Sequence, residues 1–129
     1  MERPDYASLT DILEDMNREG GYHASILARQ DGGFLIASAV SPTTNRDLVA
    51  AMAGYLVDTS ERVKKELSLG DIRDISVRCT AGKMVVKTIT TDGSDTFLLA
   101  VLMPRNIRYH SRPLGKAATR IKNLLRYKR

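Results

Sequence analysis

With 129 residues, 43% of them hydrophobic and 27% charged, the chain is long enough to bury one core and too apolar to be disordered. Its single cysteine excludes an internal disulfide, and no apolar run approaches the roughly 20 residues that cross a membrane. The net charge of +5 is uneven, because residues 104–129 hold nine Lys or Arg and no acidic residue. We therefore expect one cytoplasmic domain over residues 1–129.

The first 40 residues predict a helix followed by a β-hairpin. Apolar residues recur at spacings of three and four over residues 6–16, which places them on one helical face, and the glycines at 20–21 end the helix. Segments 22–29 and 34–40 have the composition of strands. Asp31-Gly32-Gly33 between them allows the positive φ angles that a tight hairpin turn needs.

The middle of the chain predicts one long helix over residues 46–67. Its larger apolar residues recur at helical spacing and form a stripe: Leu48, Met52, Tyr55, Leu56, Val63 and Leu67. Ala50, Ala51, Ala53 and Gly54 keep one section of the helix thin, so that another backbone element can approach. Gly54 costs about 1 kcal/mol relative to Ala in a helix interior, which indicates that this closeness matters.

Three strands and a last helix complete the chain. Segment 72–80 alternates apolar and polar residues, and Cys79 is expected to be a small buried thiol on its apolar face. Segment 84–91 is rich in β-branched residues, and the nearly continuous apolar run 95–103 is typical of a central strand covered on both faces. A helical stripe then follows over residues 111–129.

The predicted order of elements is α-β-β-α-β-β-β-α. It indicates an α/β (α+β) fold with a five-stranded, mostly antiparallel sheet. A central apolar strand needs cover on both faces, so we place the long middle helix on one face and the two terminal helices on the other.

No catalytic or metal-binding constellation stands out. Residues 114–116 look like the end of a phosphate-binding loop, but His110 occupies the position where that loop needs a glycine. The two histidines, His23 and His110, and the lone Cys79 have no partners at metal-ligand spacing. We therefore expect no enzyme activity, no cofactor and no metal.

The basic C-terminal segment is the strongest electrostatic feature. It is either a solvated helix face or a surface for an acidic protein, an anionic membrane or nucleic acid. Nucleic acid is disfavoured because few aromatic residues are available for stacking. The candidate anionic-partner residues are Arg108, Arg112, Lys116, Arg120 and Arg126.

In this order of elements, the chain resembles the roadblock family, which includes dynein light chains of the roadblock type and regulators of Ras-like GTPases. The resemblance covers nearly the whole chain. It rests on the opening helix, the hairpin around Asp-Gly, the Ala-rich middle helix, the central hairpin and the last apolar strand: residues 9–13, 26–37, 48–54, 75–78 with 82–86, and 97–101.

The resemblance implies a roadblock/profilin-like fold, a dimer and a small-GTPase partner. In the family, middle helices pack together and third strands join two sheets into one, and some members stimulate GTP hydrolysis by the partner. The family has no catalytic motif to transfer. The expected interface of a homodimer or roadblock heterodimer comprises Ala50, Ala53, Gly54, Val57, Asp74, Ile75, Ser76, Val77 and Arg78.

The strand over residues 74–79 can pair antiparallel with its own copy across a two-fold axis at Ser76. This register places Asp74 opposite Arg78 of the partner and Ile75 opposite Val77.

The resemblance and the lack of catalytic residues make the leading function a non-enzymatic dimeric scaffold or regulator of a small Ras-like GTPase. The alternative is an adaptor that uses its basic C-terminal helix. Arg46 and Arg62 on the middle helix are candidates to enter a partner's active site.

Overall fold

The computed structural model describes residues 5–31, 33–91, 95–108 and 110–126. Eight helices and strands follow one another in the predicted order. They are α1 (Tyr6–Gly20), β1 (Ala24–Arg29), β2 (Leu35–Ala39), α2 (Arg46–Leu67), β3 (Ile75–Arg78), β4 (Lys83–Thr90), β5 (Thr96–Met103) and α3 (Ser111–Arg126). The long middle helix has the bounds that the sequence predicts. Gly32 of the predicted hairpin turn and residues 127–129 of the predicted last helix lie outside the described residues.

The strands form one five-stranded antiparallel sheet in the order β2-β1-β5-β4-β3. The apolar strand β5 lies in the middle, and its residues from Phe97 to Val101 are buried. This confirms the expectation of a central strand covered on both faces. The two edge strands are β2 and β3, which are separated by the whole width of the sheet.

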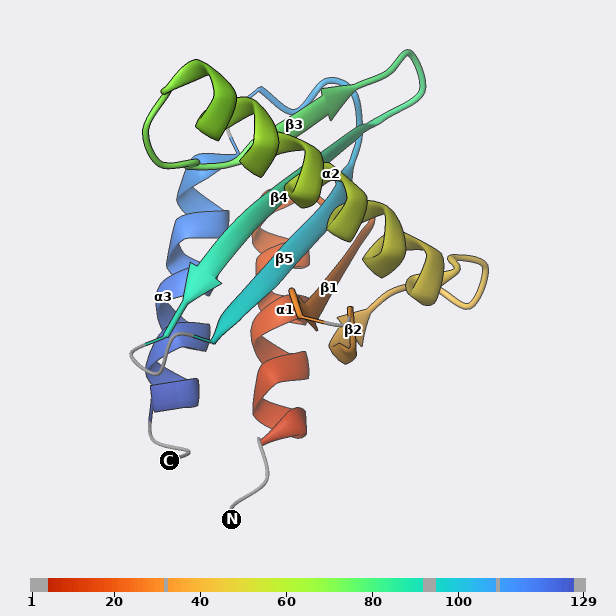
Figure 1. The fold of residues 1–129 in the computed structure, drawn as a ribbon. Helices are drawn as coiled ribbons and strands as arrows, with labels where there is room; N and C mark the ends of the chain where they lie inside the picture. The colour runs from red at the N-terminus through yellow and green to blue at the C-terminus, as the bar shows by residue number, and fades with distance from the viewer. Residues whose placement is uncertain (1–4, 32, 92–94, 109, 127–129) are drawn as a thin grey trace.

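The helices form a layer on each face of the sheet, and Figure 1 shows α2 crossing one face while α1 and α3 lie side by side on the other. The core beneath α1 and α3 contains many large side chains because both helices present amphipathic faces to the sheet. It includes Leu9, Leu13, Met16, Leu27, Leu99, Val101, Met103, Leu114 and Ile121.

The core beneath α2 is built from smaller residues. Alanines from the helix meet alanines from the strands, so the helix lies close to the sheet. The buried residues here are Ile26, Ala28, Ala50, Ala53, Val57, Val86, Leu98 and Ala100.

The ends of α1 and α2 show why these helices begin and stop where they do. The carboxylate of Asp5 accepts a hydrogen bond from the backbone N–H of Ser8, and the amide oxygen of Asn45 accepts one from Leu48. Gly21 ends α1 with a φ of 71° in the left-handed region, as the paired glycines predict. Ser68 adopts the corresponding conformation at the end of α2.

Strand β3 is shorter than the sequence indicates. The predicted strand over 72–80 is wrong at both ends, because pairing with β4 is confined to Ile75–Arg78. Cys79 lies just outside the strand and is exposed, so the expectation of a buried thiol is also wrong. The reason is that β3 is an edge strand, whose apolar face is only partly covered by α2.

Candidate functional site

The outward surface of α2 carries large apolar side chains that no other described segment of the chain covers. Leu48, Met52 and Tyr55 are 53%, 41% and 65% exposed, while Ala50 and Ala53 face the sheet. The close approach of helix and sheet leaves room only for small residues on the inner side. The stripe predicted from the sequence therefore points largely to solvent.

This orientation corrects part of the expected dimer interface. Ala50, Ala53 and Val57 are buried against the chain's own sheet, with exposures of 3%, 0% and 0%, so they are not available to a second chain. Gly54 is half-buried, and a Cβ added there would meet nothing within 4 Å. The close approach inferred from Gly54 is thus not required by the fold of one chain, and contact with a partner at this position stays a prediction.

An apolar groove of about 630 Å³ runs between α2 and the end of the sheet formed by β3 and β4. Met52, Tyr55 and Leu56 form its helical wall, and Val77 and Met84 form its floor with Leu102. Cys79 also borders the groove, on the same side of the strand as Val77, as the alternation of the sequence predicts. The groove and the exposed part of α2 form one continuous apolar surface, which we call the α2 groove.

The outer edge of β3 adjoins the α2 groove. Cys79 donates its backbone N–H to Gly82 across the turn at 2.8 Å. Since backbone groups alternate in direction along an antiparallel strand, those of Val77 point towards β4 and those of Ser76 and Arg78 point away from the sheet. The edge therefore offers backbone donors and acceptors at the residue on which the predicted two-fold axis lies.

Asp74 of the expected interface has a partner within its own chain. It lies just before β3, and its carboxylate is 3.5 Å from Nε2 of His110. The other ring nitrogen, Nδ1, is 3.2 Å from Nζ of Lys83, which also donates to the carbonyl of Ile107 at 2.9 Å. This network fixes the segment before α3 to the β3–β4 end of the sheet.

Tyr22, just after α1, adds a further hydrogen bond to the same region. Its hydroxyl donates a hydrogen bond to the carbonyl oxygen of His110 at 3.2 Å. Burial raises the pKa of the Tyr22 phenol, and the negative charge of Glu19 raises it further. Tyr22 thus stays protonated as a donor throughout the neutral range.

The basic residues predicted from the C-terminal segment do not form one surface. Lys116 pairs with Glu19 and Arg120 with Asp15, both at 3.2 Å, so the acidic residues of α1 offset part of the charge on α3. Arg108 lies in the loop before α3 and joins Arg78 and Arg105 instead. Sequence spacing did not reveal this second grouping, because it unites β3, β4 and a loop. Arg112 and Arg126 remain exposed on α3.

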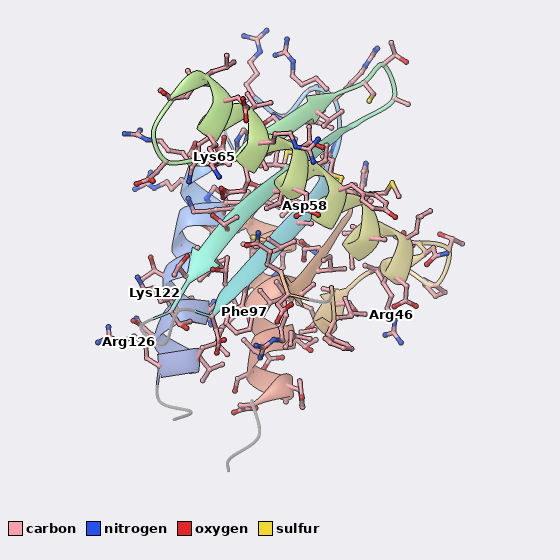
Figure 2. All side chains as sticks on the ribbon, in the orientation of Figure 1. Arg46, Asp58, Lys65, Phe97, Lys122 and Arg126 are labelled. Atoms are coloured by element: carbon pink, nitrogen blue, oxygen red, sulfur yellow. The ribbon has the colours of Figure 1, made fainter. Side chains whose placement is uncertain are left out.

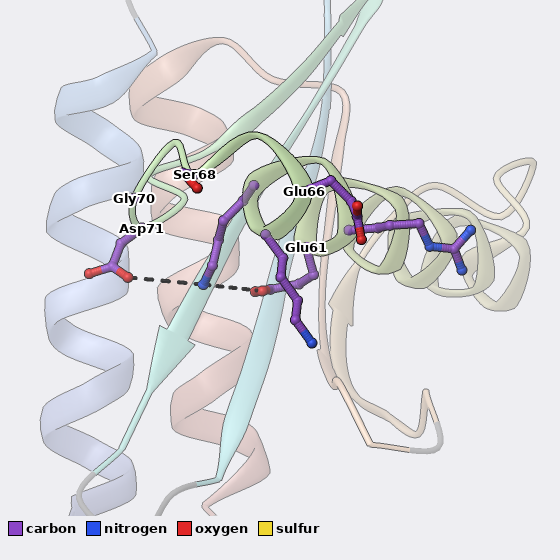
Figure 3. A pocket seen from close by; sticks show the side chains of 8 residues that line it. Glu61, Glu66, Ser68, Gly70 and Asp71 are labelled. Atoms are coloured by element: carbon purple, nitrogen blue, oxygen red, sulfur yellow. Dashed lines mark ion pairs between the residues drawn. The ribbon is translucent and has the colours of Figure 1, made fainter.

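A second depression lies at the C-terminal end of α2, where the chain turns towards β3 (Figure 3). Lys64 reaches Glu61 of the same helix at 3.3 Å and Asp71 of the turn at 4.0 Å, so only the second ion pair links the turn to the helix. Arg62, one of the two arginines considered for insertion into a partner, lines this depression. Charges of both signs alternate around it, so it has no clear preference for a ligand.

Among the residues that the structure describes there is no group of three or more His, Cys, Asp or Glu side chains placed to hold a metal ion. None of the described helices is long and apolar enough to cross a membrane.

Comparisons with known proteins identify the fold. No protein-family model and no curated protein sequence matches the chain. Solved structures do match: MglB of Myxococcus xanthus has a TM-score of 0.85 at 12% identity, with 100% of this chain and 96% of that chain covered. An MglB with a tetrameric arrangement has a TM-score of 0.82 at 14% identity, with the same coverage.

A Roadblock/LC7 domain from Streptomyces avermitilis matches with a TM-score of 0.79 at 18% identity, covering 90% of this chain and 96% of that chain. The chain therefore has the roadblock fold, and the fold implied by the sequence resemblance is confirmed. At these identities the likeness concerns the fold alone, so function has to be argued from the surfaces of this chain.

Proposed function

We propose that this protein is a dimeric, non-enzymatic regulator or scaffold of a small Ras-like GTPase. The observation that carries the proposal is the α2 groove beside the open edge of β3, in a chain with the roadblock fold. A contiguous exposed patch of apolar side chains is rare on monomeric proteins and marks a surface that another molecule covers. The sequence resemblance to roadblock regulators supplies the class of partner.

Self-association is supported by two surfaces that lie together. The edge of β3 can extend the sheet into a second copy, and the exposed apolar residues of α2 flank the same junction. A solved MglB with the same fold has a tetrameric arrangement, so the fold is compatible with assembly. In our proposal the interface uses Leu48, Met52 and Tyr55 in place of the buried Ala50, Ala53 and Val57.

The role of Tyr55 is tested by sedimentation velocity of Tyr55→Ser beside the matched control Asp58→Ser. Both positions are exposed on α2, and Figure 2 labels Asp58, which does not line the groove. We expect Tyr55→Ser to weaken the dimer at least tenfold and Asp58→Ser to leave it unchanged. Equal behaviour of the two variants, or a monomeric wild type, would contradict the proposed interface.

The register at the β3 edge has its own test. The two-fold axis at Ser76 places Asp74 opposite the partner's Arg78 on both sides of the junction. We expect Asp74→Arg to weaken the dimer and the double variant Asp74→Arg with Arg78→Asp to restore it. Because Asp74 also contacts His110 of its own chain, the variant His110→Ala controls for loss of that contact. Failure of the double variant to restore the dimer would exclude this register.

The partner is tested by recovery of bound proteins from the source cell, followed by GTP hydrolysis with and without the purified chain. We expect a small GTPase whose hydrolysis rate or localisation changes when this protein binds. Arg46 and Arg62 are exposed, so Arg46→Ala and Arg62→Ala show whether either one assists hydrolysis directly. Absence of any GTPase from the recovered proteins would contradict the proposal. Binding to anionic vesicles or DNA would favour the adaptor alternative if it is lost when Arg112 and Arg126 are replaced.

A further inference from the structure

Four basic residues line a cavity of about 450 Å³ at the end of the sheet where β3 and β4 meet the loop before α3. Arg78 comes from the end of β3 and Lys83 from the start of β4, while Arg105 and Arg108 come from the loop between β5 and α3. Asn106 and Ile107 complete the lining, which holds no acidic residue. We call this cavity the basic cleft.

Lys83 is the most unusual member of the basic cleft, because it is 7% exposed. Its Nζ contacts the carbonyl oxygen of Ile107 and Nδ1 of His110, and neither partner carries a negative charge. An ammonium group has three N–H donors, so one remains for a further acceptor. A buried cation without a counter-charge is costly, and an anion in the cleft would remove that cost.

The pairing of the strands concentrates the charge further. Arg78 lies directly opposite Lys83 in the β3–β4 register. Since Cys79 and Gly82 form the hydrogen-bonded pair next to them, Arg78 and Lys83 form a non-hydrogen-bonded pair, whose side chains lie closer together. Like charges placed opposite one another in this way destabilise a sheet.

The arginines of the loop lack acidic partners as well. Arg105 donates to the carbonyl oxygen of Thr80 at 3.4 Å, which turns its guanidinium towards the end of the β3–β4 hairpin. Over the described part of the chain, no carboxylate lies within ion-pair distance of Arg78, Arg105 or Arg108. Asp74 reaches His110 but does not line the cleft.

We propose that the basic cleft binds a ligand with a multiply charged phosphate group. Guanidinium forks match the geometry of phosphate oxygens, and the volume falls within the range of small-ligand sites. Lys83 supplies a fixed donor, and Arg105 and Arg108 supply charge from the loop before α3. Arg78, which the proposed β3 register places opposite the partner's Asp74, adds charge from the end of β3. The basic cleft shares Lys83 with the lining of the α2 groove, but its three arginines lie outside that groove, so the proposal goes beyond GTPase regulation.

The test is isothermal titration calorimetry with inorganic pyrophosphate, accompanied by amide chemical shifts. We expect saturable binding, with the largest shifts at residues 78–83 and 105–108. The double variant Arg105→Gln with Arg108→Gln removes two exposed charges and should weaken binding at least tenfold. The control Arg46→Gln with Lys122→Gln makes the same change in net charge at two exposed positions, which Figure 2 shows far from the β3–β4 end.

Vesicles that contain a phosphoinositide identify the source of the phosphate. Vesicle binding that pyrophosphate inhibits assigns a lipid headgroup, and pyrophosphate binding without vesicle binding assigns a soluble ligand. Either result supports the cleft. Absence of saturable binding to pyrophosphate, or an equal loss in the control variant, would overturn the proposal, since the second result reflects net charge alone.

Discussion

The two faces of the sheet are filled in different ways. Under α1 and α3 the core contains large residues such as Leu13, Leu99 and Met103, and both helices bury most of an apolar stripe. Under α2 the core contains mostly small residues such as Ala53 and Ala100, and larger apolar side chains of the helix remain outside. The first face is completed by the chain itself, whereas the second leaves apolar surface that a partner can cover.

This difference separates stability from association. Substitutions under α1 and α3 should change the free energy of unfolding at any protein concentration. Substitutions on the outer side of α2 should mainly change assembly, and their effect on stability should depend on concentration.

The largest effect is expected from Leu99→Ala in the central strand. Leu99 is fully buried among large side chains that cannot collapse into the space left behind. We expect a loss of about 2–5 kcal/mol in the free energy of unfolding. Urea denaturation followed by circular dichroism measures it, and a loss below about 1 kcal/mol would show that this core is less tightly packed than the structure indicates.

A smaller loss is expected from Ala53→Leu, which adds bulk between α2 and the sheet. Ala53 is fully buried, so the larger side chain must push the helix outwards at a cost of about 1–3 kcal/mol. The same denaturation experiment measures this loss. The matched substitution Ala51→Leu lies at an exposed position of the same helix and should be nearly neutral for the monomer.

Gly54→Ala should act in the opposite direction on the isolated chain. A Cβ at this position meets nothing within 4 Å, and Ala favours a helix interior by about 1 kcal/mol over Gly. We expect a gain of about 0.5–1 kcal/mol in dilute, monomeric protein. If a second chain packs at Gly54, the same variant will weaken the dimer. Stabilisation of the monomer with no change in assembly would place Gly54 outside the interface.

The smallest effect concerns Tyr22, whose phenol has a raised pKa because it is buried and lies near Glu19. In the folded chain it should ionise above its ordinary pKa of about 10, while in the unfolded chain it ionises at that value. The stability it contributes is therefore present below pH 10 and is lost as the pH rises through the folded-state pKa. The absorbance difference at 295 nm between wild type and Tyr22→Phe measures this transition, and a midpoint at or below 10 would contradict it.

The sequence predicted the elements of the sheet well where burial leaves a strong pattern. The continuous apolar run of β5 indicated a central strand, and the paired glycines at 20 and 21 indicated where α1 stops. It was less informative at β3, because an edge strand is exposed on one side and its alternation continues beyond the paired residues. Cys79 was misplaced for that reason.

The sequence alone does not show which side of α2 faces the sheet and which faces solvent. Ala50, Ala53 and Val57 recur at spacings of three and four, as do Leu48, Met52 and Tyr55, so each set defines an apolar strip. The strip of larger residues, Leu48, Met52 and Tyr55, is the more hydrophobic, so pattern alone places it in the core. The close packing of α2 on the sheet places the strip of small residues there instead.

The sequence by itself determined the order of elements, the helical and strand periodicities and the central position of β5, because these depend on local patterns of apolar residues and turns. Only the tertiary structure decided which strip of α2 faces solvent and that Arg78, Lys83, Arg105 and Arg108 meet in one cleft. Both outcomes depend on distances between elements remote in the chain, and these are set by how the layers pack.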